Sequence, residues 1–517
     1  MKFRLLFLTL SSFSLQSVTS QVNPPDTPPV SDIEQLNIDF NGNVQQFDEN
    51  FQKFLKERQK EFEDFRRKQN EEFANFIENG RWETLGKKAG VKPPKDNRDR
   101  PVVYDEKKEK KEHKSLPVRV ISDKRPSLIP QPTPGPIREN EDDMIYNSFS
   151  FYGTNMKVRW GDLSLFKLNG ISKKSLADGY RILTSDKYNN LLSDCLALRK
   201  KYVLCDWAYY KMLGAMASSV CGQGTNEATF LHGVLYQQSG YTMRFAVEKD
   251  GKETKRLHLL IKIKGIPLGK DPILVDGDVF YAFDSNSKKS LEGLVMNYKN
   301  EQDMQMEINE LPHLEFKLTD MKTRSSKKYN MNIEMAVNEN QIKFMEEYPT
   351  SYDGNDFMTR WAYYANTQAS EEMRAIIYPQ LRERLKGADE LLAVNMLLNW
   401  VQTAFEYGYD TDIWKRDRAF FSDETLHYKF SDCEDRAILF SRLVRDIIGL
   451  DVALVYYSGN PAHLSAAVCF NKHVDGDRHE LGDRVFVEAD PCYINAKVGH
   501  IQPDYYNVEG KVILLKR

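Results

Sequence analysis

The sequence predicts an α+β protein, in which helices precede an antiparallel sheet in the C-terminal part. Two segments show the apolar periodicity of helices, 386–408 and 431–449. Four short runs rich in β-branched and aromatic residues then follow, which is typical of strands. The runs are VALVYY (452–457), LSAAVCF (464–470), RVFVEAD (484–490) and KVILLK (511–516). At 517 residues the chain is too long for one core, so several domains are expected.

Residues 1–20 have the features of a secretory signal peptide. Lys2 and Arg4 precede an apolar run that ends near Leu15, and small residues follow before Gln21. The run is too short to cross a membrane, and no later stretch approaches 18 unbroken apolar residues. We therefore expect an exported protein, periplasmic or secreted, whose mature chain has no membrane span.

The overall charge and the cysteines limit the class of protein. A formal net charge of -3 gives no reason to expect binding to nucleic acid. Six cysteines in a chain of this length do not make a disulfide scaffold. In an oxidising compartment Cys195, Cys205 and Cys221 could still pair among themselves, and the sequence leaves this open.

Residues 21–91 combine a proline-rich spacer with a long charged helix that ends near Gly80. Pairs of phenylalanines recur every 11 residues, which is three helical turns, so they form one stripe. The stripe consists of Phe51, Phe54, Phe62, Phe65, Phe73 and Phe76. We expect it to dock on the globular part of the same chain, with self-association or partner docking as the alternative.

The rest of the chain divides by composition. Residues 92–143 are rich in proline and charge and poor in apolar residues, so we expect a flexible linker. Globular sequence begins at 144. Within it we expect three parts: a domain at 144–290, a connecting β segment at 291–360 and a catalytic domain at 361–517.

Cys433 is the strongest candidate for a nucleophile. Ser431 followed by Glu434 has the spacing of a capping box, which places Cys433 in the first turn of a helix. Unpaired backbone N–H groups and the helix dipole favour a thiolate there, and the same N–H groups suit a developing oxyanion. A side chain that completes an oxyanion hole could be Gln402 or Trp414.

A base and its orienting partner follow in the sequence. His463 begins one strand, after a turn-forming Asn-Pro, and Asp490 ends another strand before Pro491. If these strands are antiparallel neighbours, the imidazole and the carboxylate lie side by side. Cys433, His463 and Asp490 would then form a nucleophile, base and orienting group.

These motifs resemble the transglutaminase-like superfamily of papain-like cysteine enzymes, and within it the bacterial transglutaminase-like cysteine proteinases. The resemblance covers about 370–517 and is carried by DETLHYKFSDCEDRAILFSRLVRDIIGLDVALV, GNPAHLSAAV and VFVEADP. It implies a core in which a Cys-bearing helix packs on an antiparallel sheet that bears His and Asp. It also implies that Cys433 is the nucleophile, His463 the base and Asp490 the residue that orients the imidazole.

The sequence departs from the family pattern near the sulfur. Ser431 stands where many relatives have glycine, and Asp432, Glu434 and Asp435 place negative charge that opposes a thiolate. Zinc binding through Cys433 and His463 is an alternative, but no CxxC, HExxH or second cysteine at ligand spacing supports it. Neither a cofactor nor a metal is therefore expected. Cys469 and Cys492 are expected to be core residues without a bridge between them.

Residues 221–246 resemble the segment around Cys433 in sequence. Aligning Gly240 with Gly449 makes 144–290 a degenerate copy of the catalytic domain that lacks the cysteine. On that register Gly224 takes the position of Cys433, and further on His258 before a strand and Asp284 at the end of another resemble His463 and Asp490. Chance similarity between two amphipathic helices is the alternative.

Two classes of function follow. The first is an exported cysteine enzyme that acts on amide or peptide bonds of a protein or peptide substrate through a thioester, with hydrolysis favoured over cross-linking. The second is a non-catalytic binding or scaffold protein that keeps the transglutaminase-like fold. A third reading makes the phenylalanine-striped helix the functional part and the globular half its anchor.

Overall fold

The structure is a computed structural model of the chain. It describes residues 30–92, 100–107, 112–123, 131–132, 134–135, 137–140, 145–160, 166–250, 253–284, 289–295, 301–354 and 356–515. The expected signal peptide lies outside these residues. The chain divides into two units, 1–61 and 62–517, and helix α1 (Val30–Asn79) runs through the boundary between them. No described helix combines the length and the apolarity needed to cross a membrane.

Helix α1 ends at Asn79, as the phenylalanine repeat predicted, but the stripe is not uniformly buried. Phe73 is 1% exposed and stacks on Tyr180 at 4.7 Å between ring centroids. The other five phenylalanines of the stripe are between 43% and 57% exposed. Docking on the globular part extends from about Glu63, through the hydrogen bond of Asn70 to Thr184, to the buried end of α1 at Ile77.

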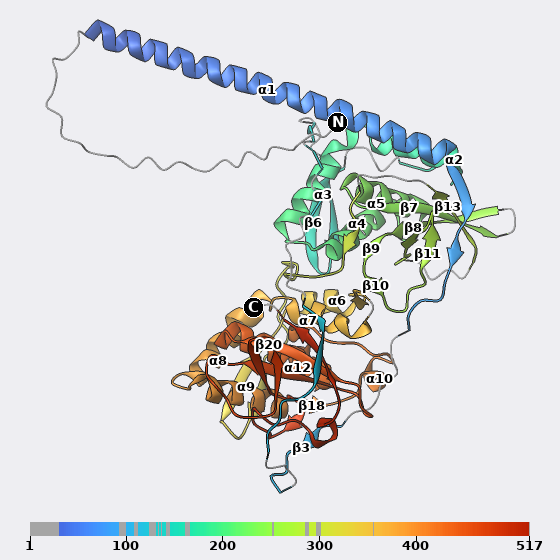
Figure 1. Ribbon diagram of the computed structural model, residues 1–517. Coiled ribbons are helices and arrows are strands. Elements are labelled where there is room, and N and C mark those ends of the chain that lie inside the picture. The colour runs from blue at the N-terminus through green and yellow to red at the C-terminus, as the bar shows by residue number, and fades with distance from the viewer. Residues whose placement is uncertain are drawn as a thin grey trace. The chain divides into compact units, whose positions relative to one another are not determined.

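The first half of the second unit has helices followed by an antiparallel sheet (Figure 1). Its helices are α2 (Lys173–Leu183), α3 (Asn189–Lys201), α4 (Asp206–Cys221) and α5 (Asn226–Gln238). Its four-stranded sheet has the order β1 (Arg81–Thr84), β13 (Leu291–Val295), β7 (Met243–Asp250), β8 (Glu253–Ile261). Strand β8 therefore lies at one edge of this sheet. Smaller strands flank it: β2 (Gly86–Lys87), β5 (Tyr146–Phe151), β6 (Thr154–Arg159), β9 (Ile263–Lys264), β10 (Ile266–Pro267), β11 (Ile273–Val275) and β12 (Asp278–Phe280).

The connecting segment at 291–360, expected to be β structure, contains a helix as well as short strands. It holds β14 (Met304–Gln305), β15 (Lys322–Ser326), β16 (Met331–Met335) and β17 (Ser351–Tyr352), together with α6 (Glu339–Glu346). The run LEFKLTD forms no strand and makes only an isolated bridge between Leu318 and Asn338.

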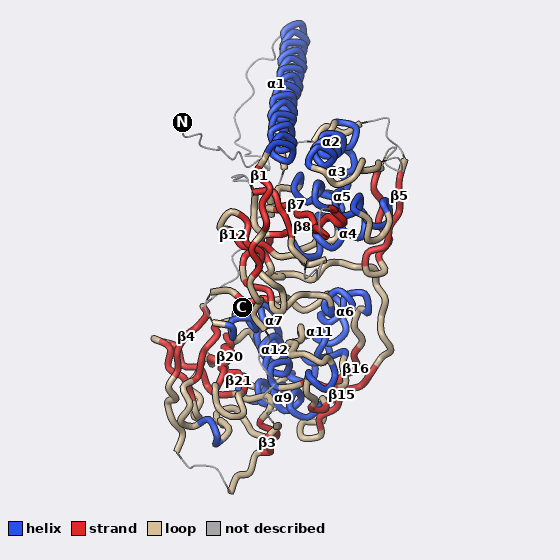
Figure 2. Tube along the Cα trace, turned by 90° about the vertical axis from the view of Figure 1, so that its right-hand side faces the viewer, coloured by secondary structure: helices blue, strands red, loops and turns tan. Residues whose placement is uncertain are grey.

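In the C-terminal half, helices pack against one mostly antiparallel sheet (Figure 2). The α+β class predicted from the sequence is confirmed. Its helices are α7 (Arg360–Asn366), α8 (Tyr378–Leu385), α9 (Glu390–Ala404), α10 (Asp410–Ile413), α11 (Ser422–His427) and α12 (Cys433–Leu443). A π-helical turn (Val444–Ile448) extends α12 to Gly449. The short strands β18 (Glu406–Tyr407) and β19 (Phe430–Ser431) pair just before α12.

The six-stranded sheet of this half contains all four strands that the sequence predicted. Its order is β22 (Arg478–Leu481), β23 (Arg484–Glu488), β21 (His463–Cys469), β20 (Asp451–Tyr457), β25 (Gly510–Leu514), β4 (Val118–Ser122). Leu454, Ala466 and Val468 are completely buried on the face of the sheet that joins the core shared with α12. This packing fixes the start of α12 relative to the strands.

The expectation of a flexible linker at 92–143 is wrong for part of that segment. Strand β4 pairs in parallel with β25, and β3 (Val102–Val103) pairs with β24 (Tyr493–Ile494). Leu116 is 4% exposed in a second core beneath the sheet. Composition averaged over the whole segment hid the alternating run LPVRVIS, which has enough apolar residues to complete a sheet edge.

The two halves share a strand register. Tyr457 lies eight residues after Gly449 and pairs with His463, and Glu248 lies eight residues after Gly240 and pairs with Arg256. Arg256, and not His258, therefore stands at the place of His463.

The position of Asp284 agrees with its match to Asp490 in the sequence. Asp490 lies three residues after Val487, which pairs with Val468. Asp284 likewise lies three residues after Tyr281, which bridges to Ile261. This match is consistent with a duplication, which stays a prediction.

We predict that Phe73→Ala destabilises the second unit whereas Phe76→Ala does not. Removing a buried aromatic ring costs about 3–5 kcal/mol, whereas an exposed one costs about 0.5 kcal/mol or less. Urea unfolding of the full-length variants measures the difference. Equal effects of the two substitutions would show that the end of α1 is not docked.

Candidate active site

Cys433 lies in the first turn of α12, as the sequence predicted, and it is the first helical residue because the helix cap lies one residue later than expected. Asp432 is the N-cap, and its side chain accepts a hydrogen bond from the Asp435 N–H. Asp435 in turn accepts from the Asp432 N–H at 3.3 Å. Ser431 instead ends β19 and accepts from Arg436 Nε at 3.1 Å.

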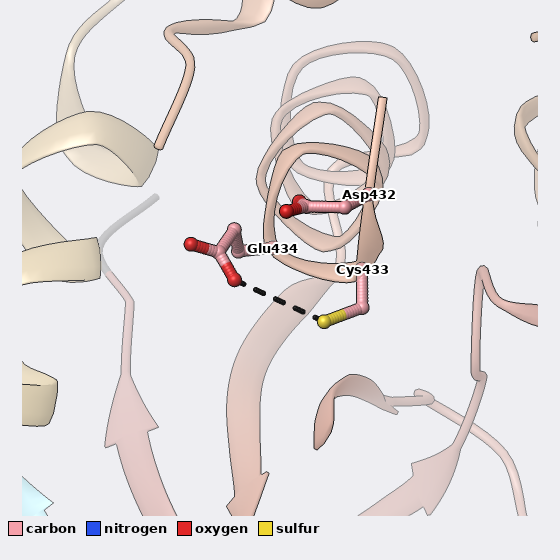
Figure 3. A group of neighbouring side chains, drawn as sticks. All are labelled: Asp432, Cys433 and Glu434. Atoms are coloured by element: carbon pink, nitrogen blue, oxygen red, sulfur yellow. Dashed lines mark hydrogen bonds between the residues drawn. The ribbon is translucent and has the colours of Figure 1, made fainter. Parts of the chain in front are cut away.

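The change of cap alters the role of Glu434. Its side chain is not part of the capping box and lies beside the sulfur, with 3.9 Å between Cys433 Sγ and Glu434 Oε2 (Figure 3). Cys433 is 7% exposed, and its thiol donates to this carboxylate oxygen. The other carboxylate oxygen of Glu434 is buried and has no hydrogen-bond partner.

Burial changes the charge of the acids around the sulfur. Burial, followed by neighbouring carboxylates, raises the pKa of Asp410 and of Glu434 well above the usual range. Burial likewise raises the pKa of Asp435 to about 7. These groups hold protons that an exposed acid would lose near neutral pH. The negative charge that the sequence placed against the thiolate is therefore reduced in the folded protein.

His463 and Asp490 lie together, as the sequence predicted. His463 Nε2 is 2.9 Å from Asp490 Oδ2, and both side chains are 2% exposed. Gln502 Nε2 donates to the same carboxylate oxygen at 2.7 Å and lies 3.2 Å from the imidazole nitrogen. Tyr505 stacks on the imidazole at 5.3 Å between ring centroids. The Asp490 carboxylate thus fixes Nε2, so Nδ1 is the nitrogen with which the ring would act as a base.

A short series of contacts connects the imidazole pair to the start of α12. The other oxygen of Asp490 accepts from the Cys492 N–H at 2.8 Å. Cys492 Sγ lies 4.0 Å from the carbonyl oxygen of Asp432, the residue that precedes Cys433. The pair and the candidate nucleophile therefore belong to one neighbourhood.

The side chain of Gln402 is used in hydrogen bonds to the backbone, so the suggestion that it donates to an oxyanion is wrong. Its side-chain NH₂ group donates to the backbone carbonyls of Asp490, Tyr493 and Ala496 at 3.0, 2.8 and 3.2 Å. Its oxygen accepts from the Asn495 N–H. The other candidate, Trp414, has a buried indole N–H without a partner.

Sequence reasoning missed Gln502 and Tyr505, because both lie in an irregular segment with no periodic signal. The loop that contains them, QPDYY, follows the last predicted strand but one. A polar residue and an aromatic residue within three positions of a turn-forming proline were the only signal in the sequence.

The acidic side chains near Cys433 could also hold a cation. Ligand atoms come within 4.8 Å of one another in three groups among the described residues. The groups are Asp432, Cys433, Glu434; Asp410, Asp432, Asp435; and Asp410, Asp417, Glu434. Carboxylate oxygens suit a hard cation such as Ca²⁺ more than zinc. His463 is in none of these groups, so they give no support to a Cys–His zinc site.

All six cysteines lie in the described part of the chain, and none of them forms a disulfide there. Comparisons with protein-family models, curated proteins and solved structures found no match to this chain.

We predict that Glu434→Gln flattens the pH dependence of stability. Folded-state pKa values above the unfolded values mean that the folded protein binds more protons, so stability falls as pH rises from about 4 toward 7 and beyond. Glutamine removes one of these protons and lowers the repulsion on its neighbours. Thermal unfolding between pH 5 and pH 8 measures the slope.

Glu383→Gln is the matched control, because the Glu383 side chain is 75% exposed. A slope that is the same for E434Q and wild type would contradict the assignment of a buried, protonated acid beside Cys433.

Proposed function

We propose that the protein is a thiol enzyme with a transglutaminase-like core that cleaves amide or peptide bonds through a thioester. The observation that carries the proposal is the buried His463–Asp490 pair, which reaches the start of α12 through Cys492. A cysteine at the first position of a helix supplies the sulfur that such a pair activates.

The proposed reaction has two stages. Cys433 gives its proton to His463 Nδ1, and Sγ attacks the carbonyl carbon to form a C–S bond. The C–N bond breaks as His463 returns the proton to the leaving amine, which leaves a thioester. Water, deprotonated by His463, then attacks the thioester and releases the carboxylic acid and the thiol.

The developing oxyanion needs donors, and the start of α12 offers backbone N–H groups. The capping box uses the N–H groups of Asp432 and Asp435. The backbone N–H groups in the first turn of a helix are in general not used by the helix itself, which is why a helix start suits a developing oxyanion. No side-chain donor is needed for this arrangement, which fits the structural role of Gln402.

The alternative is a binding protein that keeps the core without its chemistry. The observation that favours it is the burial of Cys433, whose thiol donates to Glu434. Reactivity of the sulfur separates the two functions, since a binding protein has no need of an activated thiol.

We predict that iodoacetamide at pH 7 alkylates Cys433 at least tenfold faster than Cys221. Cys221 is the more exposed thiol, but burial raises its pKa to about 11, so only about one part in 10,000 is thiolate at pH 7. Peptide mapping by mass spectrometry after timed quenching gives both rates.

His463→Ala is expected to lower the Cys433 rate at least tenfold, because the base is lost, while leaving the Cys221 rate unchanged. If Cys433 reacts no faster than Cys221, and His463→Ala has no effect, the proposed enzyme is rejected and the binding protein is favoured. Release of peptides from casein, compared with incorporation of a fluorescent amine, then separates hydrolysis from cross-linking.

Gln502 is proposed as a positioning residue for the His463–Asp490 pair. We predict that Gln502→Leu shifts the pH midpoint of Cys433 alkylation, since the hydrogen bond that stabilises the Asp490 carboxylate is lost. A merely structural role would lower the thermal midpoint without shifting the pH profile. Gln368→Leu is a suitable control, because Gln368 lies outside the candidate site.

A further inference from the structure

A cavity of about 530 Å³ lies in the first half of the second unit, away from Cys433. Helix α4, the start of α5, the hairpin of β5 and β6, and strand β8 supply its walls. Gly224, Arg256 and Asp284 all line it. Asp284 and Arg256 occupy the register positions of Asp490 and His463, so this cavity stands where a duplicated domain would have its active site.

The cavity lacks the counterparts of Cys433 and His463. Counted from the helix caps, Asn226 takes the place of Cys433, because each is the first residue of its helix. Gly224 lies just before the cap, in the turn. Arg256 cannot act as a general base, since a guanidinium stays protonated. The cavity is therefore suited to binding rather than to catalysis.

A buried imidazole in the wall has an unused acceptor. His232 is 5% exposed and its Nε2 has no hydrogen-bond partner. Burial lowers the pKa of His232 to about 4, so the ring is neutral at pH 7, and it is hydrogen-bonded to the backbone of Tyr210. Nε2 is then an acceptor that requires an N–H or O–H donor. Gly214 makes room for this ring, because a Cβ there would lie 3.1 Å from it.

The charges of the cavity largely offset one another. Lys211 forms an ion pair of 2.8 Å with Glu347, and the Tyr210 hydroxyl donates to Asp284. Arg256 is the remaining cation, at the exposed rim. A ligand with hydrogen-bonding groups and little net charge fits such walls better than a phosphate or another strong anion.

Strand β8 contributes an edge with outward-facing backbone groups. The Leu257 N–H donates to Asn226 Oδ1, and Ile261 exchanges two hydrogen bonds with Tyr281, so alternate residues of β8 turn away from β7. Leu259 lies between them and lines the cavity. Its outward N–H and C=O form no hydrogen bond with any described residue. An extended peptide backbone has the donor and acceptor spacing to pair with this edge.

We propose that this cavity binds an extended peptide segment without cleaving it, with one ligand N–H on His232 and its backbone along Leu259. The choice of a peptide rests on the proposed function, because the cavity stands where a second copy of a peptide-cleaving site would lie. Such a site would hold a polypeptide substrate at a second point while its scissile bond is processed elsewhere.

The test uses the full-length Cys433→Ser protein, so that peptides are not consumed. The probe is a tryptic digest of casein whose amino groups carry a benzophenone. After irradiation, mass spectrometry maps the adducts. We expect adducts on α4, α5 and β8, and at least a tenfold loss of them in Ser218→Trp, since Ser218 lines the cavity. Ser219→Trp is the matched control, because Ser219 is exposed on the same helix and does not line it.

Arg256→Ala provides a second variant at an exposed position, with at least a threefold loss expected. Equal adduct yields in Ser218→Trp and Ser219→Trp, or adducts confined to 430–505, or no adducts, would overturn the inference. None of these results would affect the alkylation rate of Cys433. Conversely, an inert Cys433 with adducts lost in Ser218→Trp would reject the proposed enzyme and keep the peptide site.

Discussion

The candidate site depends on hydrogen bonds at the end of helix α9. These bonds connect α9 to the turn after Asp490 and to helix α12. The side-chain NH₂ group of Gln402 donates to three backbone carbonyls of the turn that begins at Asp490. The backbone carbonyl of Gln402 accepts a hydrogen bond from Arg436 Nη1. Arg436 also binds the carbonyl of Phe405, so a fully buried cation satisfies the carbonyls at the end of α9. The helix that bears Cys433 and the turn that bears Asp490 are thereby fixed to the same few atoms.

The sequence predicted the parts of the site that follow from periodicity, and failed where the parts depend on distant contacts. The helix that begins at Cys433 and the strands of His463 and Asp490 follow from local pattern and turn residues. Gln402 was misassigned because its amide is equally suited to an oxyanion and to carbonyls. Only the three-dimensional turn after Asp490 decides between them. Strand β4 was missed because its pairing with β25 joins residues almost 400 positions apart.

The acids beside Cys433 show a second limit of sequence reasoning. A sequence gives the number of carboxyl groups but not their protonation, which is set by burial and by mutual repulsion. Asp410, Glu434 and Asp435 are all buried, and burial raises the pKa of each of them. The same desolvation that makes these groups costly to ionise lowers their opposition to a thiolate. Either bound protons or a bound hard cation would reduce the negative charge of these carboxyl groups. Both would therefore make the Cys433 thiolate easier to form.

The two halves of the second unit show which features belong to the fold and which to the chemistry. Register positions of the hairpins agree from Gly240 and Gly449 onward, and an aspartate closes both. The sheets differ, since β8 lies at an edge whereas β21 pairs on both sides, and the residues at the compared positions differ too, with Arg256 in place of His463 and Asn226 in place of Cys433. Side chains at such positions can change without loss of the core, because strand pairing and helix packing do not use them. The buried acceptor of His232 faces a cavity large enough for a ligand, and this arrangement is consistent with a first half kept for binding.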